Sequence, residues 1–550
     1  MSSTLTSYTH PIDRLHWLNA NMPDESWLHE QIDGEWVTLN CKEAINRALR
    51  IGNALRSLGL EPGDKVAILA KNSPQWMISD FALMMAGMIS VPIYTTAGEK
   101  TISYVLEHSG AKAVFVGKLE GTAAAEATLR DIKVIAYPET NVSSEVIDHQ
   151  WNELLAADPL EDIASPNISE MATLVYTSGS TGNPKGVVLS FENLAAAAQG
   201  VIEAQPAKEK HRVLSYLPMA HITERSLVSI VSLYELGDIY FSGGLDTFMG
   251  DLQHAKPTNF ISVPRLWAKF QAQVLAVIPD HDLQALLASD QGEEIAAGIR
   301  EKLGLQHAKQ YASGSAPIPP GLLTWFHGIG MPISEGWGMT ETSGASCTNM
   351  PFNPDHLGTL GTPLSCVEMS LSNEQEILIR GPAIFKKYYN NPEATAEAFV
   401  DGWFRTGDKA ELRDDGAYRI IGRVKEQFKT AKGKYVAPVP IESLLGALPY
   451  VEQVCVLGIG RAQPMAIVVP IAQEGQTPEQ LVERMEADMN TTNENLEPHC
   501  KLNCIILSAE PMSIDNGMLT PTLKLKRDVI EAHFAECLGD ENKGVIWQTA

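Results

Sequence analysis

The chain has 550 residues, of which 44% are hydrophobic and 20% are charged, and its formal net charge at pH 7 is -25. This length exceeds one ordinary hydrophobic core, so at least two domains are expected, and the composition excludes a large disordered fraction. The acidic balance opposes binding to nucleic acid and broad adsorption to an anionic membrane. A polyanionic ligand would therefore need a local site built from amides, a few cations or a metal ion.

The N-terminal part of the chain alternates helical and strand-like patterns. Such alternation predicts a layered α/β sheet. Short apolar runs predict the strands, and apolar residues at helical spacing predict the helices. The predicted strands are 65–69, 113–116, 133–136, 212–217, 239–242 and 260–263, and the predicted helices include 36–60 and 75–89.

From about Ala383 the pattern changes to short strands separated by turn signals at Asp401-Gly402, Asp415-Gly416 and Lys432-Gly433. These dipeptides favour tight turns. They predict a β-rich subdomain that leads into a last α+β unit, with the boundary near Arg423. The predicted fold class is α/β, with a large N-terminal domain and a small C-terminal α+β domain.

The cysteines and the apolar segments indicate the compartment. Seven scattered cysteines without C-x-x-C spacing indicate a reducing environment. No basic start followed by an apolar segment is present, and the longest apolar run, 81–94, is shorter than the roughly 20 residues of a spanning helix. We expect a cytoplasmic protein, and peripheral contact with a membrane stays open.

The strongest local signal is TLVYTSGSTGNPKGVVL at 173–189. Small residues let backbone amides approach phosphate oxygens, hydroxyls add hydrogen bonds, and a lysine adds charge. The loop lacks the G-x-x-x-x-G-K-[ST] pattern of nucleoside triphosphatases. A flexible surface loop is the alternative to a phosphate cradle. The residues predicted to hold phosphate are Thr177, Ser178, Gly179, Ser180, Thr181, Gly182 and Lys185.

Further polar motifs follow at 311–317 (YASGSAP), 334–342 (SEGWGMTET) and 401–408 (DGWFRTGD). The glycines of the second motif allow close backbone approach, and its glutamate is a suitable ligand for a hard cation. The aspartate that ends the third motif could accept hydrogen bonds from two adjacent hydroxyls, as in a ribose. As a lone TGD, it would more often be a turn or a helix cap.

YTSGSTGNPKG resembles the signature of the adenylate-forming superfamily, which includes acyl-CoA synthetases, peptide-synthetase adenylation domains and firefly luciferase. The other motifs follow in the family's order, and the resemblance extends from about Trp36 to Ile530. It implies an adenylation domain at 1–422, a hinge at 423–425 and a mobile C-terminal domain at 426–550. It also implies ATP, Mg2+ and coenzyme A as cofactors or co-substrates.

The resemblance assigns nucleotide-binding roles to the three motifs. Trp337 would stack on adenine, where most relatives carry Tyr, beside Gly338 and the pocket lined by Gly314, Ser315 and Ala316. Thr340 would contact phosphate, and Glu341 would bind Mg2+. Asp408 would hold the ribose hydroxyls, and Arg423 would contact the ribose and phosphate region.

The resemblance also assigns roles in the C-terminal part. Lys425 takes the hinge position, and Lys432, Gly433 and Lys434 fall where relatives line the channel for pantetheine. In LTPTLKLKR at 519–527, Lys524 aligns with the lysine that serves adenylation. Lys526 remains a competitor for that role because the family's usual spacing is missing.

Two segments, SYLPMAHITER at 215–225 and SVPRLWAKF at 262–270, resemble long-chain fatty acyl-CoA synthetases. His221 would border the active site, and Trp267 would gate an acyl tunnel; without the family, His221 would more often be a core histidine. The predicted function is ATP-dependent ligation of a fatty acid to coenzyme A through an acyl-adenylate. Alternatives are an aryl or medium-chain acid CoA ligase and an acyl-AMP ligase that loads a carrier protein. A phosphate-binding NTPase is the alternative from another class.

Overall fold

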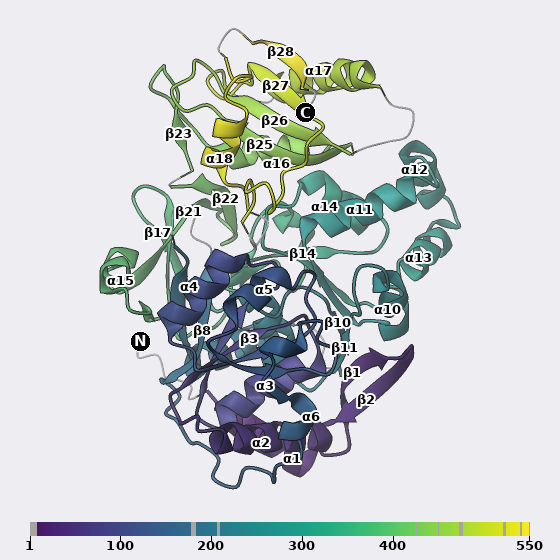
Figure 1. The fold of residues 1–550 in the computed structure, drawn as a ribbon. Coiled ribbons are helices and arrows are strands. Elements are labelled where there is room, and N and C mark those ends of the chain that lie inside the picture. Colours follow the sequence, from purple (N-terminus) through teal and green to yellow (C-terminus); the bar gives the residue numbers. More distant parts are fainter. Residues whose placement is uncertain are drawn as a thin grey trace.

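The computed structural model describes residues 8–177, 183–205, 210–424, 426–448, 450–471, 477–494, 496–520, 524–539 and 542–548. A large N-terminal domain contains several layered sheets, and a small α+β domain formed by the end of the chain lies against one end of it (Figure 1). This arrangement confirms the predicted fold class.

An eight-stranded sheet forms the centre of the N-terminal domain. Its strands from β7 to β8 run parallel, whereas β9 and β19 are antiparallel additions at one edge. In spatial order the strands are β19 (Lys387–Tyr388), β9 (Lys185–Ser190), β8 (Met171–Thr177), β4 (Ile89–Ile93), β3 (Lys65–Leu69), β5 (Ala113–Val116), β6 (Lys133–Ala136) and β7 (His149–Gln150). The accompanying helices are α1 (Pro11–Asn21), α2 (Cys41–Ser57), α3 (Pro74–Met85), α4 (Glu99–Ser109), α5 (Ala123–Thr128), α6 (Trp151–Leu154) and α7 (Phe191–Ala204).

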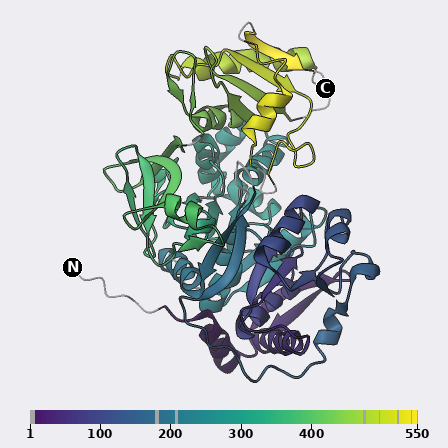
Figure 2. The ribbon, with the colours of Figure 1, turned by 60° about the vertical axis from the view of Figure 1, so that its left-hand side comes forward.

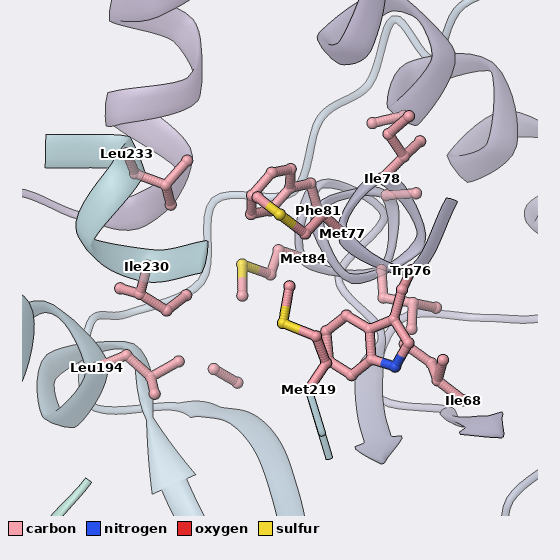
Figure 3. Packing of buried hydrophobic residues seen from close by; sticks show 14 of the residues in the cluster. Ile68, Trp76, Met77, Ile78, Phe81, Met84, Leu194, Met219, Ile230 and Leu233 are labelled. Atoms are coloured by element: carbon pink, nitrogen blue, oxygen red, sulfur yellow. The ribbon is translucent and has the colours of Figure 1, made fainter. Parts of the chain in front are cut away.

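Helix α3 is the most deeply buried of these helices. Ser73 caps its N-terminus by accepting a hydrogen bond from the backbone of Trp76, and Pro74 occupies the first turn. Trp76 and Phe81 of α3 pack with Met219 in one apolar cluster, which also holds the side chains of α7 and α9 (Figure 3). This cluster joins the eight-stranded sheet to the next layer.

That next layer consists of two smaller sheets. The first has the order β10 (Arg212–Ser215), β11 (Asp238–Phe241), β1 (Ser26–Ile32) and β2 (Glu35–Asn40), and the second has the order β12 (Asn259–Ser262), β13 (Gln310–Ser313), β14 (Ile333–Trp337), β15 (Cys347–Thr348) and β16 (Thr362–Pro363). The helical elements here are α8 (Ile222–Glu224), a π-helical segment (Arg225–Ile230), α9 (Val231–Tyr234), α10 (Phe248–Ala255), α11 (Pro264–Leu275), α12 (Asp280–Leu287), α13 (Gly292–Lys302) and α14 (Pro320–Gly328). Strands β12 to β14 are parallel, so their carboxyl ends share one edge.

An antiparallel sheet follows and lies to one side of these layers, below the C-terminal domain (Figure 2). It contains β17 (Glu368–Leu371), β18 (Glu376–Arg380), β20 (Phe399–Val400), β21 (Trp403–Leu412) and β22 (Tyr418–Arg423), with α15 (Pro392–Ala398) beside it. The predicted turns at Asp401-Gly402 and Asp415-Gly416 are confirmed, because they connect β20 to β21 and β21 to β22. The β-rich region starts at Glu368, earlier than predicted.

The C-terminal domain is built on a four-stranded sheet. The turn predicted at Lys432-Gly433 connects β23 and β24, which form a separate two-stranded sheet. Its elements are β23 (Phe428–Lys429), β24 (Tyr435–Val436), α16 (Pro438–Gly446), β25 (Val451–Leu457), β26 (Met465–Pro470), α17 (Pro478–Glu494), β27 (Cys504–Ser508), α18 (Arg527–His533) and β28 (Gly544–Gln548). Within the described ranges, every helix is too short or too polar to traverse a bilayer.

The predicted strands 65–69, 113–116 and 133–136 are confirmed residue for residue. The helix predicted from residue 36 was wrong at its start, because 35–40 form strand β2 paired with β1. Asn40 then begins α2 with a capping box to Glu43. The helix predicted to reach residue 89 ends at Met85, because Gly87 has a φ of 75° and β4 starts two residues later.

Candidate active site

A buried carboxylate lies where β14, β21 and β22 meet. The Asp408 side chain accepts a hydrogen bond from Trp337 Nε1 at 2.9 Å on one oxygen and from Arg423 Nε at 2.6 Å on the other. Asp408 and Arg423 are direct partners across the β21–β22 ladder, so their side chains share a face. Each carboxylate oxygen keeps capacity for another hydrogen bond, which leaves room for two neighbouring hydroxyls.

Arg423 supplies a fixed positive charge beside this carboxylate. Burial by itself would lower the pKa of Arg423, but the Asp408 and Glu426 carboxylates together outweigh burial, so that the pKa is raised. The Glu426 carboxylate lies 3.6 Å from Arg423 Nη1. An always-charged guanidinium at this position suits an anionic ligand.

The turns around Trp337 bring backbone close to the same position. A Cβ on Gly338 would lie 1.8 Å from the carbonyl oxygen of Gly344, so no larger residue fits there. Gly314 directly follows β13, and Ser315 has a φ of 68°. Gly314, Ser315 and Trp337 line one cavity, whereas Ala316 is exposed. The structure therefore brings the predicted adenine-binding segments together.

Glu341 and Lys185 both contact Tyr388. Glu341 accepts a hydrogen bond from the Tyr388 hydroxyl at 2.9 Å, and Lys185 Nζ lies 4.9 Å from the centre of the Tyr388 ring. Burial, followed by the Glu341 charge, raises the pKa of Tyr388, so its hydroxyl stays a donor. Sequence reasoning missed Tyr388, because one tyrosine of the run KKYY carries no motif.

The phosphate cradle is described only at its two ends. Thr177 ends β8 and is paired with Lys185, which opens β9, and Thr177 Oγ1 donates to the Lys185 carbonyl at 3.4 Å. The predicted residues Ser178, Gly179, Ser180, Thr181 and Gly182 lie outside the described residues. Thr340 opens the short 3-10 turn Thr340–Thr342 that carries Glu341.

Glu341 fits a magnesium site that is completed by a substrate. In the described part of the chain, no group of three or more His, Cys, Asp or Glu residues could hold a metal ion by itself. Mg2+ is commonly bound through one or two carboxylates together with phosphate oxygens and water. Glu341 supplies one accessible carboxylate, which matches that chemistry if substrate phosphates complete the site.

Lys524 of the C-terminal domain reaches the same site. Desolvation by the surrounding protein lowers the pKa of Lys524, and the positive charge of Arg423 lowers it further. The charges of Glu341, Asp408 and Glu426 act in the opposite direction and raise it. Its backbone is held in a tight loop, with Lys524 N donating to Thr520 Oγ1 at 3.0 Å. Lys526 is the N-cap residue of helix α18 (Arg527–His533). The choice of Lys524 over Lys526 as the adenylation lysine stays a prediction.

The other predicted C-terminal residues lie elsewhere. Lys432, Gly433 and Lys434 form the exposed turn between β23 and β24, and the neighbouring Ala431 bonds to Arg461 of the same domain. No hydrogen bond among the described residues links this turn to Asp408 or Glu341. The predicted hinge residue Lys425 lies outside the described residues.

Ion pairs connect the two domains in this arrangement. Arg265 at the start of α11 pairs with Glu452 of β25. Glu426, which follows the predicted hinge, lies 3.6 Å from Arg527 as well as 3.6 Å from Arg423. Exposed pairs contribute little to stability, so they can re-form elsewhere at small cost.

An apolar cavity of about 110 Å³ leads away from Trp337. It runs between the strands β11 to β13 and the helical elements α7, α9 and the π-helical segment. His221 lies just before α8, where its Nδ1 accepts a hydrogen bond from Thr223 N at 3.2 Å. Burial, with a smaller effect of the Lys524 charge, lowers the pKa of His221 to about 4. His221 is therefore neutral near pH 7 and borders the same site as Lys524.

Trp267 lies in the core. It is fully buried, donates from Nε1 to the carbonyl of Ala312 at 3.3 Å, and packs edge-on against Phe260 and Phe326. It is absent from the lining of the apolar cavity. Its predicted gating role stays a prediction, and any such role would require the ring to leave this aromatic cluster.

Comparison with known proteins identifies two family matches. Residues 16–389 match the family described as AMP-binding enzyme, and residues 425–538 match the AMP-binding enzyme C-terminal domain. The chain is 30% identical to "Long-chain-fatty-acid--CoA ligase FadD15" of Mycobacterium bovis, over 93% of this chain and 94% of that protein.

Solved structures share the fold. The adenylation domain of a carboxylate reductase from Mycobacterium chelonae matches with a TM-score of 0.82 and 22% identity, covering 97% of this chain and 91% of that one. O-succinylbenzoate coenzyme A synthetase from Bacillus subtilis, solved with ATP and a magnesium ion, matches with a TM-score of 0.72 and 21% identity, covering 95% and 99%.

Proposed function

The chain belongs to the AMP-binding enzyme family, and we propose that it is a long-chain fatty acid CoA ligase that works through an acyl-adenylate. One observation carries the proposal: besides desolvation, the charges of Arg423, Glu341 and Asp408 of the N-terminal domain act on the pKa of Lys524, so this side chain of the C-terminal domain lies near them. The positive charge of Lys524 thus lies where an anionic acid and an anionic nucleotide would meet. The apolar cavity that starts at Trp337 gives the acyl chain a place to bind.

In the first half-reaction, a carboxylate oxygen of the acid attacks the α-phosphorus of ATP. The new O–P bond gives acyl-AMP, and the bond to pyrophosphate breaks. Both reactants are anions, so placement and charge stabilisation dominate catalysis. Lys524 stabilises charge between the carboxylate and the α-phosphate, and Lys185 with the 177–182 loop holds the other phosphates. Mg2+, bound through Glu341, supplies further neutralisation of phosphate charge when present.

The nucleotide would be oriented by the N-terminal domain. Asp408 accepts hydrogen bonds from the ribose hydroxyls while Trp337 and Arg423 hold its two oxygens in place. The Trp337 ring and the Gly314 to Ala316 turn enclose adenine, with Gly338 allowing close approach. Thr340 contacts phosphate beside Glu341.

In the second half-reaction, the sulfur of coenzyme A attacks the acyl carbon, the thiol proton is lost and AMP leaves. We assign the change between the halves to rotation of the domain 426–550 about Lys425 relative to the domain 1–422. The exposed turn at Lys432, Gly433 and Lys434 would then face the site and line the path of pantetheine. The absence of that turn from the present site is consistent with an adenylating arrangement.

We propose that the protein is cytoplasmic and that it contacts membranes only to take up its substrate. The site needs only its substrates, Mg2+ and coenzyme A. Free thiols support this location, since all seven cysteines are unpaired.

The test is ATP-dependent pyrophosphate release with acetate, octanoate, palmitate, oleate and benzoate, each with and without coenzyme A. The proposal predicts release that depends on a long-chain acid and ends in acyl-CoA. Release without thioester would indicate an acyl-AMP ligase for a carrier protein, and preference for octanoate or benzoate would indicate a medium-chain or aryl ligase. ATP hydrolysis that is independent of any acid would overturn the ligase assignment in favour of an NTPase.

A further inference from the structure

One carboxylate lies between three cations at the junction of the two domains. Glu426 follows the predicted hinge, and one of its oxygens lies 3.6 Å from Arg423 Nη1 while the other lies 3.6 Å from Arg527 Nη2. Its negative charge also acts on Lys524, where it works against the burial that lowers the pKa of that amine. Arg423 ends β22, whereas Lys524 and Arg527 belong to the C-terminal domain. Glu426 therefore faces positive charges from both sides of the junction.

Arg527 is fixed within the C-terminal domain. Its Nη2 donates to Glu442 Oε2 at 2.8 Å, its Nη1 donates to the other Glu442 oxygen, and Nη1 also donates to the Val456 carbonyl at 3.3 Å. That other oxygen, Glu442 Oε1, accepts a hydrogen bond from Val456 N at 2.7 Å. Two parallel hydrogen bonds to one carboxylate fix both the position and the orientation of a guanidinium. The start of α18 is therefore held against α16 and β25.

A short segment with internal hydrogen bonds connects Arg527 to Lys524. Lys524 N donates to Thr520 Oγ1 at 3.0 Å, and Thr520 N donates to the Lys524 carbonyl at 2.8 Å. Lys526 N, which directly precedes α18, donates to the Met518 carbonyl at 2.8 Å. A displacement of Arg527 would therefore move the loop that carries Lys524.

Glu426 and Glu442 contribute differently to this cluster. Glu442 belongs to the same domain as Arg527, so this pair stays together when the domain turns. Glu426 also pairs with Arg423, which lies on the strand side of the site. Without the Glu426 charge, Arg423 would face the cations of Lys524 and Arg527 unbalanced, and like charges repel. Glu426 therefore favours the arrangement in which Lys524 lies beside the nucleotide site.

We propose that Glu426 is a positioning residue for adenylation, which joins Arg423 to Arg527 and thereby places Lys524 for the first half-reaction. This inference rests on the proposed function, because it takes the role of Lys524 from there. Glu426 acts on the reacting atoms only through other side chains. Its contribution falls on acyl-AMP formation, where the lysine acts, and not on thioester formation, for which the domain turns.

The experiment measures the two half-reactions separately in Glu426→Gln. Single-turnover formation of acyl-AMP from palmitate, ATP and Mg2+ gives the first, and conversion of supplied palmitoyl-AMP with coenzyme A gives the second. The modest strength of two partly exposed ion pairs predicts that acyl-AMP formation slows by about three- to tenfold. The rate of thioester formation should stay close to wild type, which also shows that the variant is folded.

Glu531→Gln is the matched control. Glu531 lies on the same helix as Arg527, and its carboxylate lies 3.6 Å from Arg461 of the same domain. The side chains of Glu531 and Glu426 are similarly exposed, at 27% and 31%. Because the Glu531 pair does not cross the junction, both half-reactions of this variant should be near wild type.

A double-mutant cycle shows through which cation Glu426 acts. If Glu426 acts by placing Lys524, Glu426→Gln should slow acyl-AMP formation no further in a Lys524→Ala background. If it acts instead through Arg423 on the binding of ribose, the same loss should persist in that background.

Four results would each overturn the inference: equal slowing of both half-reactions by Glu426→Gln, an equal loss in Glu531→Gln, an undiminished loss in the Lys524→Ala background, or wild-type rates in Glu426→Gln. The ligase assignment would stand in all four cases, because it is judged from the wild-type protein. Failure of every acid to stimulate pyrophosphate release by the wild-type protein would instead count against the proposed function.

Discussion

The two sides of the candidate site are held in different ways. On the nucleotide side, Trp337, Asp408 and Arg423 come from three strands and are joined by direct hydrogen bonds. On the lysine side, Lys524 lies on a loop of another domain, and its backbone bonds are to its own loop. Desolvation lowers the pKa of Lys524, and the charges of Arg423, Glu341 and Asp408 also act on that pKa, which is its link to the site.

The nucleotide side therefore supplies fixed positions, and the lysine side supplies a charge that can move. Side chains fixed on strands hold the same geometry throughout the reaction, which suits the binding of a nucleotide that serves both half-reactions. No hydrogen bond among the described residues joins the Lys524 side chain to the site, so its charge can be withdrawn without breaking one of these bonds. The strand side should therefore affect both half-reactions, and the loop side only one.

The largest effect is expected for Lys524→Ala. Loss of the Lys524 charge at the α-phosphate should slow acyl-AMP formation by about 10²–10³-fold, the range seen when one preorganised stabilising group is removed. Conversion of supplied acyl-AMP and coenzyme A to acyl-CoA should stay within a few-fold of wild type. Lys526→Ala is the control and should be near wild type in both assays. A larger defect in Lys526→Ala would transfer the role to that residue.

A smaller effect, on both halves, is expected for Asp408→Asn. Weaker hydrogen bonds to the ribose should reduce kcat/KM for ATP by about 10–100-fold, as for bonds to a charged acceptor. Measuring ATP beside 2′-deoxy-ATP in both proteins gives a double-mutant cycle. Wild type should discriminate against the deoxynucleotide, and the variant much less. Unchanged discrimination would remove Asp408 from the ribose site.

The smallest effect is a shift in the titration of His221. Burial and the Lys524 charge lower the pKa of His221 to about 4, so loss of the positive charge should raise that pKa in Lys524→Ala. Burial is the larger cause, so the pKa should stay below the usual value of about 6.5. NMR titration of labelled histidine in both proteins measures the shift. An identical pKa in the variant would mean that Lys524 does not lie beside His221.

Much of the framework was predictable because its signals are local. Strands 65–69, 113–116 and 133–136 are short apolar runs buried in a parallel sheet, so composition identifies them without tertiary information. The sequence pattern places residues 36–40 in a helix because they merge with the start of α2, yet pairing with β1 makes them part of a strand. That pairing is a contact that no local pattern contains.

The site was predictable as a set of motifs and less so as a set of contacts. Trp337, Asp408 and Arg423 are each in a motif, but the hydrogen bonds between them depend on how three strands meet. Tyr388 reaches Glu341 from a segment 47 positions away.

The central claim is that the present arrangement serves adenylation and that the C-terminal domain must move for thioester formation. Arg265 and Glu452 pair across the two domains in this arrangement and are exposed enough to modify. Arg265→Cys with Glu452→Cys, in a background of Cys500→Ser and Cys537→Ser, can be joined by a short bis-thiosulfonate reagent. The other five cysteines are buried.

The measurement follows acyl-AMP, pyrophosphate and acyl-CoA in the joined enzyme, before and after reduction of the link. We predict that the joined enzyme makes acyl-AMP and pyrophosphate in a single burst without acyl-CoA, and that reduction restores acyl-CoA formation. Acyl-CoA formation by the joined enzyme at the rate of the reduced enzyme would contradict the account.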